Sequence, residues 1–331
     1  MSARIIVAGI DGGASSTTCV IADGEGQVLG VGRGGPIDHL YRPAGRRQTQ
    51  TALREAIGAA WRDARPRIPV RPAVRAVVAG LTGLEPDSAE SRHAARMIRA
   101  LLPADVVRAT WDAEIAFAGA SGGTPGVMVI AGTGSVALGR NRAGRTARAG
   151  GYGFLIDDVG GGVSIGQAAL RVALRAADGR GPRTALEAML KKHLGEWPEI
   201  RARVYGEGGG RPLLASLAPL VHRAARRGDP MARDILAEAG RSLGQLALAV
   251  AERLRMNREP FDLFLVGGVF AMGAPVVEPL RAVVRVRAPR GRIRRPRYPP
   301  AVGAVFMALD ASGIRLTPQI LRRLRSTLAR T

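Results

Sequence analysis

Residues 5–23 of the chain read IIVAGIDGGASSTTCVIAD. An apolar run ends in Asp11 and two glycines, four small hydroxyl residues follow, and a second apolar run returns to Asp23. This pattern predicts a strand, a tight turn and an antiparallel returning strand. Gly12 and Gly13 would let backbone N–H groups approach an anion closely, and the hydroxyl residues would add donors. The turn is therefore expected to hold the phosphates of a nucleotide, with Asp11 placed to hold Mg²⁺ and its waters beside them.

An ordinary glycine hairpin with a polar turn is the alternative interpretation of this stretch. This stretch matches neither of the two best-known nucleotide-binding loops, since residues 5–23 carry neither the Gly-x-Gly-x-x-Gly nor the Walker pattern. The choice between the two interpretations depends on glycine clusters farther along the chain.

The composition predicts a soluble globular protein. The chain has 331 residues, of which 46% are hydrophobic and 23% charged, so two domains with buried cores are expected. No apolar run reaches the roughly 18 residues that a membrane span requires. Cys19 is the only cysteine, which excludes an intrachain disulfide and fits the reducing cytoplasm. The four histidines are scattered without metal-ligand spacing, so a structural zinc site is not expected.

The formal net charge of +22 comes almost entirely from arginine, because Lys191 and Lys192 are the only lysines among 49 cationic residues. The densest arginine run, residues 285–297, has a single aromatic neighbour, Tyr298. A stacking platform for single-stranded nucleic acid needs more aromatic residues than that. The run therefore predicts a solvated basic face, and no nucleic-acid partner is expected.

The order of predicted elements restarts near residue 126. Three strands, a helix, a strand, a helix and a strand fill the first part of the chain. The second part opens again with a strand, a Gly/Ser/Thr turn (residues 132–135) and a strand, which indicates a weak internal repeat. The expected strands are 5–11, 17–23, 27–32, 74–79, 106–111, 126–131, 136–139 and 261–266, and the expected helices are 49–64, 88–102, 114–120, 165–177, 213–227, 231–254 and 301–309.

Taken together, these motifs resemble the superfamily of sugar kinases, actin and heat-shock-protein ATPases. Within it, the chain is similar to the N-acetylglucosamine kinase group, which also contains the ATPase activators of benzoyl-CoA-type reductases. The order and spacing of the motifs carry the resemblance over almost the whole chain. They are Asp11-Gly12-Gly13 with Ser16-Thr17-Thr18, Trp111-Asp112-Ala113, Ile130 to Ser135, Gly150 to Gly153 with Asp158, and Val266-Gly267-Gly268.

The resemblance implies an α/β protein with a two-lobed ribonuclease H-like (actin-like ATPase) fold and a nucleotide cleft between the lobes. The lobes are expected at residues 1–113 and 114–331, with the last helix packing back on the first lobe. ATP and Mg²⁺ are the implied cofactors, and Asp11 is the implied metal residue. The implied nucleotide-binding residues are Gly12, Gly13, Ser15, Ser16 and Thr17 in the first turn, Gly132, Thr133, Gly134 and Ser135 in the second, and Gly267 and Gly268 beside the adenosine. An ordinary strand-to-helix turn is the alternative for Gly267-Gly268.

Asp112 is the expected catalytic residue. Transfer of a phosphoryl group to a sugar hydroxyl requires a group that accepts the hydroxyl proton, and a carboxylate at a strand end can do so. The alternative is that Asp112 only caps the helix that follows it.

The resemblance assigns the sugar to Asp38, His39, Thr133, Gly151, Tyr152 and Asp158. Alternatively, His39 is an ordinary loop residue and Asp158 caps a helix. The chain departs from the usual kinase pattern, which has Asn at Asp38, Trp at Tyr152 and Gly-Asp-Glu-Gly-Ser in place of Asp157-Asp158-Val159-Gly160-Gly161, so that a Glu is lost at Val159. These departures affect the identity of the sugar more than phosphate binding.

The expected function is ATP-dependent phosphorylation of an amino sugar, N-acetylglucosamine first, by a cytoplasmic homodimer without a membrane partner. One alternative is a non-catalytic sugar or nucleotide sensor. The other is an ATPase activator of a reductase or dehydratase. Such activators hold an iron–sulfur cluster through cysteines, which one cysteine within the first hairpin does not favour.

Overall fold

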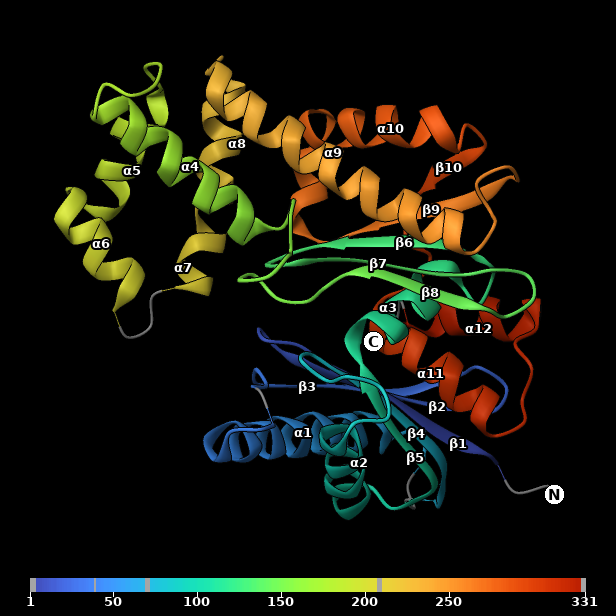
Figure 1. The fold of residues 1–331 in the computed structure, drawn as a ribbon. Helices are drawn as coiled ribbons and strands as arrows, with labels where there is room; N and C mark the ends of the chain where they lie inside the picture. Colours follow the sequence, from blue (N-terminus) through green and yellow to red (C-terminus); the bar gives the residue numbers. More distant parts are fainter. Residues whose placement is uncertain (1–3, 39, 69–71, 207–209, 329–331) are drawn as a thin grey trace. The chain divides into compact units, whose positions relative to one another are not determined.

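The computed structural model describes residues 4–38, 40–68, 72–206 and 210–328, which form two compact units. Unit 1 comprises Met1–Thr124 together with Pro296–Thr331, and unit 2 comprises Pro125–Arg295. Compared with the expected division after residue 113, residues 114–124 and the whole C-terminal segment from Pro296 are part of unit 1. Figure 1 shows that segment in red beside the blue and teal elements of unit 1.

Unit 1 is built on a five-stranded mixed sheet in the order β3-β2-β1-β4-β5. β1, β2 and β3 form an antiparallel meander, whereas β4 and β5 run parallel to β1. The carboxyl ends of β1, β4 and β5 therefore lie at the same edge of the sheet. The strands are β1 (Ile6–Gly12), β2 (Thr17–Asp23), β3 (Val28–Gly34), β4 (Val74–Leu81) and β5 (Ala104–Trp111), and the helices are α1 (Pro43–Ala64), α2 (Ala89–Leu101), α3 (Asp112–Ser121), α11 (Pro300–Ala311) and α12 (Pro318–Leu328).

The apolar residues of β1 alternate between the two faces of this sheet, as the two-residue period of a strand requires. Ile6, Ala8 and Ile10 join a buried cluster with α1 and α2. Val7 joins a second cluster with α11 and α12. Both faces are thus covered, which explains why β1 reads as a continuous apolar run rather than an alternating one.

Glycines let α11 pack tightly within unit 1. A Cβ on Gly9 of β1 would lie 2.8 Å from Val305 Cγ2, and one on Gly303 would lie 3.0 Å from the Cα of Gly119 in α3. The sequence of α11 is almost wholly apolar, and eight of its residues are buried. This close packing explains why the C-terminal segment belongs to unit 1.

Unit 2 repeats the sheet of unit 1, with strand order β10-β9-β6-β7-β8. β6, β7 and β8 form the antiparallel meander, and β9 and β10 continue it in parallel with β6. The internal repeat expected from the two glycine turns is therefore present in the strand topology. The strands are β6 (Gly126–Ala131), β7 (Ser135–Arg140), β8 (Thr146–Gly150), β9 (Phe261–Val266) and β10 (Gly291–Arg294).

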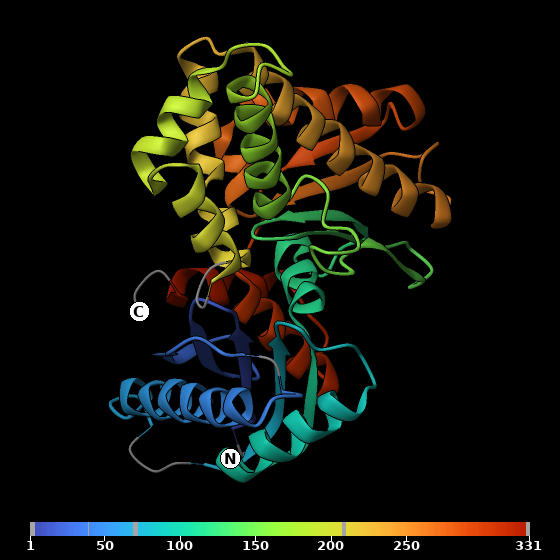
Figure 2. The ribbon, with the colours of Figure 1, turned by 60° about the vertical axis from the view of Figure 1, so that its left-hand side comes forward.

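A helical layer covers one face of this sheet, and α9 is its longest member (Figure 2). The core between them is rich in Val, Ile, Leu and Ala, including Val127, Val129 and Leu243. The helices of unit 2 are α4 (Gly162–Ala177), α5 (Ala185–Leu194), α6 (Trp197–Tyr205), α7 (Arg211–Ser216), α8 (Ala218–Arg226), α9 (Pro230–Arg253) and α10 (Ala274–Arg287), with a 3₁₀ turn η1 (Gly268–Met272) after β9.

The expected α/β class and ribonuclease H-like architecture are confirmed by the two repeated sheets with their covering helices. The expected helix 213–227 is wrong as a single element, because α7 ends at Ser216 and α8 begins at Ala218, with Pro219 in its first turn. Among the described residues, no helix is long and apolar enough to cross a membrane.

Candidate active site

The turn between β1 and β2 is closed by the N–H of Gly13, which donates to the carbonyl of Ser16 at 2.9 Å. Gly12 and Thr17 face each other as the last ladder pair. Ala14, Ser15 and Ser16 are exposed, so their backbone and hydroxyl groups are accessible to a ligand. The predicted hairpin is therefore present, with its hydroxyl residues at the tip.

Neighbouring segments hold the base of this hairpin in place. The carbonyl of Gly12 accepts from the N–H of Thr82 at 2.9 Å, and the carbonyl of Gly13 accepts from the N–H of Ile37 at 3.0 Å. The buried hydroxyl of Thr17 donates to the Gly35 carbonyl at 2.8 Å, which gives this side chain a structural role. A Cβ on Gly12 would lie 2.6 Å from Leu81 Cδ2, so any other residue here would have to displace the end of the Leu81 side chain.

Asp11 and Asp112 lie at the same edge of the unit 1 sheet. Asp11 pairs with Gly80 across β1 and β4, while Leu81 pairs with Trp111, the residue before Asp112. Two strand spacings separate the backbones, which is about 10 Å. Burial, and then the charge of Asp112, raise the pKa of Asp11 to about 6. The structure thus brings the expected metal residue and the expected base into one electrostatic environment.

Asp112 is the first residue of α3, and the N-cap is Trp111. The helix limits thus place Trp111 rather than Asp112 at the N-cap, and a carboxylate in the first turn is stabilised by the helix dipole. The other acid of this turn, Glu114, is held by the Thr110 hydroxyl at 2.5 Å and by Arg108 at 2.9 Å. Glu114 is therefore held against β5 by its side-chain hydrogen bonds.

The two aspartates fit a hard divalent cation. Their like charges and the burial of Asp11 disfavour the ionised pair, and a bound cation would relieve that cost. Within the described ranges, no cluster of three or more acidic, histidine or cysteine side chains could hold a metal by itself. Mg²⁺ suits such a site, because it uses one or two carboxylates and takes its other ligands from water and phosphate.

The expected sugar residues of unit 1 lie in the loop after β3. Asp38 is partly buried, and its carbonyl accepts from the hydroxyl of Thr49 in α1 at 3.0 Å. His39 lies outside the described residues. The sugar role of this loop stays a prediction.

In unit 2, the turn between β6 and β7 is fastened to the start of α4. The N–H groups of Gly162 and Val163 donate to the carbonyls of Gly132 and Thr133, at 2.8 and 3.1 Å. Thr133 itself is exposed. A Cβ on Gly132 would meet nothing within 4 Å, so space is left beside this residue. The turn has the open, glycine-lined form that close approach of an anion requires.

Asp158 lies directly against this turn. Its side chain is buried, its backbone is left-handed (φ 68°), and its Cγ would be 2.7 Å from a Cβ placed on Gly134. Burial raises the pKa of Asp158, while a hydrogen bond from the N–H of Ser135 and the charge of Arg211 oppose the rise. The structure therefore brings together Gly134, Ser135 and Asp158, and adds Arg211, which no sequence motif indicated.

Tyr152 projects from a loop that only glycine can form, because Gly150, Gly151 and Gly153 all have positive φ. The residue is 63% exposed, and the guanidinium carbon of Arg148 lies over its ring, 4.8 Å from the centroid. Arg148 also donates to the carbonyls of Gly150 and Gly151. Arg148 is thus a second residue that the sequence did not single out, and it fixes the loop that carries Tyr152.

Gly267 and Gly268 follow β9 and lie beside the β6 turn. Gly267 has φ 109°, and a Cβ there would be 2.7 Å from the Ala131 carbonyl carbon and 3.1 Å from the Gly132 nitrogen. Gly268 begins the 3₁₀ turn, and a Cβ on it would meet nothing within 4 Å. Two glycine segments far apart in sequence therefore meet in unit 2.

Comparison with known proteins agrees with this arrangement. Residues 8–308 match the sequence model of the BadF/BadG/BcrA/BcrD ATPase family. The chain belongs to this ATPase family. The match covers both sheets and all the glycine turns described above, so the expected family is confirmed.

Two curated relatives of this family member are sugar kinases. The N-acetylmuramic acid/N-acetylglucosamine kinase of Clostridium acetobutylicum is 32% identical over 91% of this chain and 97% of its own length. The N-acetyl-D-glucosamine kinase of Dictyostelium discoideum is 29% identical over 94% of this chain and 99% of its own. These relatives, with the family, confirm the expected class of enzyme, an ATP-dependent phosphotransferase.

Solved structures confirm the fold. A Chromobacterium violaceum protein, provisionally named as an N-acetylglucosamine kinase, superposes with a TM-score of 0.72 at 27% identity, covering 92% of this chain and 99% of that one. A ROK family glucokinase from Streptomyces griseus superposes with a TM-score of 0.59 at 18% identity, with the same coverage of both chains.

Proposed function

We propose that this ATPase-family member transfers the γ-phosphoryl group of ATP to a hydroxyl of an amino sugar, with N-acetylglucosamine as the first candidate. The observation that carries the proposal is the pair of aspartates, Asp11 and Asp112, at one edge of the unit 1 sheet. The curated relatives, which include a glucosamine kinase from Vibrio cholerae, support a sugar as the acceptor.

Asp112 is the proposed general base. As the sugar oxygen bonds to the γ-phosphorus, the bond from that phosphorus to the bridging oxygen breaks and ADP leaves. The proton of the sugar hydroxyl passes to the carboxylate of Asp112. General-base assistance is typically worth about 10² to 10⁴-fold in rate.

Asp11 is the proposed residue for Mg²⁺. When bound, Mg²⁺ neutralises phosphate charge that develops during transfer. Ser15 and Ser16 would donate to phosphate oxygens from the exposed tip of the hairpin. Gly12 and Gly13 shape that turn, while Thr17 anchors its base.

In unit 2, residues 132–135 are the proposed second phosphate-binding turn, and Gly267-Gly268 the proposed adenosine site. The open space beside Gly132 and Gly268 supports these assignments, since a ligand can approach the backbone closely where no side chain stands. The N–H of Gly132 itself donates to the Gly134 carbonyl at 3.0 Å, so this residue would contribute space rather than a hydrogen bond. Their contact at Gly267 makes one continuous ligand surface of the two segments.

The sugar is assigned to Asp38 and His39 in unit 1, and to Thr133, Gly151, Tyr152 and Asp158 in unit 2. The buried carboxylate of Asp158 supports its share of this assignment. A buried acceptor held by the Ser135 N–H is well oriented for a sugar hydroxyl.

We further propose that the enzyme acts in the cytoplasm as a homodimer and without nucleic acid. The arginine run 285–297 is exposed, and two of its members already form ion pairs, Arg287 with Glu252 at 2.9 Å and Arg294 with Asp262 at 3.3 Å. Such pairing reduces the field available to a polyanion. Light scattering of the purified protein tests the dimer, and a salt-dependent DNA shift would contradict the absence of nucleic acid.

The deciding experiment is ADP release with Mg-ATP and a panel of sugars. N-acetylglucosamine, N-acetylmuramic acid, glucosamine and glucose are each compared with ATP alone. We expect the highest kcat/KM for an N-acetylated sugar, and mass spectrometry should find the phosphorylated sugar. Release of ADP that no sugar stimulates would reject the kinase and favour a plain ATPase.

A further inference from the structure

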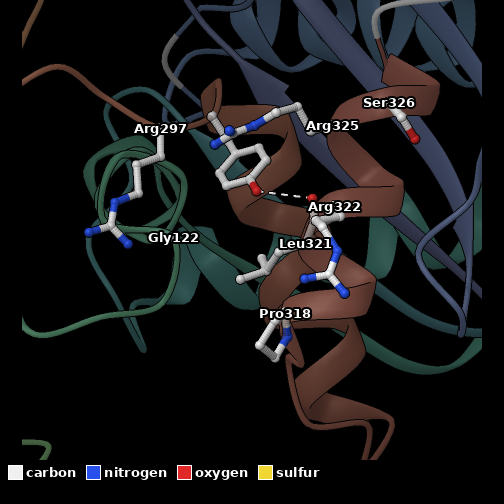
Figure 3. Close-up of a pocket in the computed structure, with 8 residues that line it drawn as sticks. Gly122, Arg297, Pro318, Leu321, Arg322, Arg325 and Ser326 are labelled. Carbon is white, nitrogen blue, oxygen red and sulfur yellow. Dashed lines mark hydrogen bonds between the residues drawn. The ribbon is translucent and has the colours of Figure 1, made fainter.

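A cavity of about 430 Å³ lies within unit 1, at the end of α3 that is remote from Asp112. Figure 3 shows three arginine side chains around it, contributed by α12 and by the segment that precedes α11. None of the candidate site residues described above lines it. The lining residues are Gly122, Arg297, Tyr298, Pro318, Leu321, Arg322, Arg325 and Ser326.

The charge of this cavity is one-sided. Three of its lining residues are arginines and none is acidic. On the same helix, Arg323 faces another way and contacts Glu25 and Gln27. No carboxylate in the described part of the chain forms an ion pair with Arg322 or Arg325. Two like charges three residues apart on a helix repel each other, so this arrangement costs free energy unless an anion is bound.

The walls of the cavity are held in place by contacts that do not use the arginine charges. The Tyr298 hydroxyl donates to the Leu321 carbonyl at 3.0 Å, and its ring packs edge-on against Phe306 at 5.1 Å. The N–H groups of Arg297 and Tyr298 donate to the carbonyls of Ala120 and Gly119, the last turn of α3. The cavity is therefore preformed, and binding there would need little ordering of the backbone.

Arg325 is oriented by this frame, because its guanidinium lies 5.2 Å from the Tyr298 ring centroid. Stacking on an aromatic ring leaves the edge of a guanidinium, with its N–H donors, directed outward. Ser326 also lines the cavity, but its hydroxyl donates to the Arg323 carbonyl at 3.0 Å and leaves no donor for a ligand. Pro318 and Leu321 supply an apolar wall. The cavity therefore combines guanidinium groups that can bind an anion with a small apolar surface.

We propose that this cavity binds a small phosphate monoester. Guanidinium groups match the oxygens of phosphate in paired, charge-assisted hydrogen bonds, and the dianion complements an excess of positive charge. The volume lies within the range of about 300 to 1,000 Å³ that small-molecule sites occupy. The site is independent of the proposed kinase activity.

The test is calorimetric titration of the whole protein without ATP, using glucose 6-phosphate, inorganic phosphate and glucose as separate probes. We expect glucose 6-phosphate to bind in this cavity, and we expect glucose, which lacks the phosphate, not to bind there. If inorganic phosphate binds as tightly as the ester, the apolar wall contributes nothing and the proposed ligand class is rejected in favour of the free anion. Binding should weaken with added salt.

The variants Arg322→Gln and Arg325→Gln locate the binding. Each variant should bind glucose 6-phosphate about tenfold or more weakly, which corresponds to a loss of about 1.4 kcal/mol of binding free energy. The matched control is Arg96→Gln, which removes one exposed arginine from α2 of the same unit. Arg322→Lys keeps the charge but loses the paired hydrogen bonds, so it should also weaken binding.

Equal losses in all the charge-removing variants would show that net charge alone attracts the ester, and would overturn the proposal. Unchanged affinity in both cavity variants would show that glucose 6-phosphate binds elsewhere, for example at the proposed sugar site. That result would also overturn the proposal. Because Arg322 and Arg325 are exposed and lack ion-pair partners among the described residues, their replacement is not expected to unfold the protein.

Discussion

Asp112 lies close enough to Asp11 for its charge to act on the ionisation of that residue. Burial contributes most, and the negative charge of Asp112 adds to it, so that the pKa of Asp11 rises to about 6. Two acids that share an edge of a parallel sheet without a cation between them are energetically unfavourable. Such a cost is typical of functional sites, where stability is exchanged for a prepared electrostatic environment.

Replacing Asp112 with Asn should abolish phosphoryl transfer while leaving the fold intact. The amide cannot accept the hydroxyl proton, so kcat should fall by about 10² to 10⁴-fold. ADP release with saturating sugar measures kcat, and circular dichroism checks the fold. Asp105→Asn is the matched control, because Asp105 is an exposed residue of β5, the strand that precedes Asp112, and pairs with Arg75 at 2.7 Å. Equal activity in Asp112→Asn and Asp105→Asn would remove the base assignment.

Replacing Asp11 with Asn should stabilise the metal-free protein above about pH 6. An acid whose pKa is raised by folding favours the native state at low pH, and this contribution is lost as the pH rises from about 4 to about 6. The variant lacks this penalty, so its free energy of unfolding at pH 7.5 should exceed that of the wild type by about 1 to 2 kcal/mol. Urea unfolding in EDTA, at pH 4 and pH 7.5, measures the difference.

Mg²⁺ provides the second arm of the Asp11 experiment. If Asp11 helps to hold the ion, Mg-ATP should stabilise the wild type more than the variant, and the variant should require more Mg²⁺ for turnover. Equal stability of the two proteins at both pH values would show that the ionised Asp11 carboxylate does not destabilise the fold. An unchanged Mg²⁺ requirement would show that Asp11 does not help to hold the metal ion.

The sheets could be predicted from the sequence because their strands carry local signals. β6 and β9 were predicted with their observed limits, since each is a predominantly apolar run that follows a proline and ends at a glycine. β10 was missed because its four residues include Arg292 and Arg294, which resemble a solvated charge run. Arginines on an edge strand discourage pairing with another chain, but no sequence period reveals that they belong to a strand.

The candidate site was predictable in its glycines and acids but not in what surrounds them. The glycine turns and Asp112 stand next to strand ends, where a sequence pattern can place them. Arg148 reaches the site through hydrogen bonds within its own loop, to the carbonyls of Gly150 and Gly151. Arg211 reaches it through a tertiary contact, with the charge of Asp158. In a chain with so many arginines, nothing local distinguishes these two from the rest.

The two outer glycines of the β6–β7 turn should respond differently to alanine. At Gly134, the new methyl group would overlap the buried carboxylate of Asp158, so the free energy of unfolding should fall by about 1 to 3 kcal/mol. At Gly132, the methyl group meets nothing within 4 Å, and stability should change by less than about 0.5 kcal/mol. If a phosphate approaches Gly132, the same substitution should still weaken ATP binding. An ATP affinity unchanged in a stable Gly132→Ala protein would contradict that role, and thermal unfolding with calorimetry decides it.

The thiol of Cys19 should report on opening of unit 1. It is fully buried in β2, and burial raises its pKa to about 12, so almost no reactive thiolate exists in the native state at neutral pH. Ellman's reagent should label the protein slowly, and at full stoichiometry only after unfolding in guanidinium chloride. Because Cys19 is the only cysteine, each labelling event reports the same strand.

Nucleotide binding should slow this labelling. β2 forms one side of the proposed phosphate hairpin, so a ligand that binds only the folded hairpin lowers the population of the open state. At Mg-ATP concentrations of about 100 times Kd, the stabilisation is about 2.7 kcal/mol, which corresponds to about 100-fold slower labelling. Measurements at several Mg-ATP concentrations give Kd directly from the rate. Rapid labelling of the native protein would contradict the buried placement of Cys19. If Mg-ATP leaves the labelling rate unchanged, the hairpin does not bind the nucleotide.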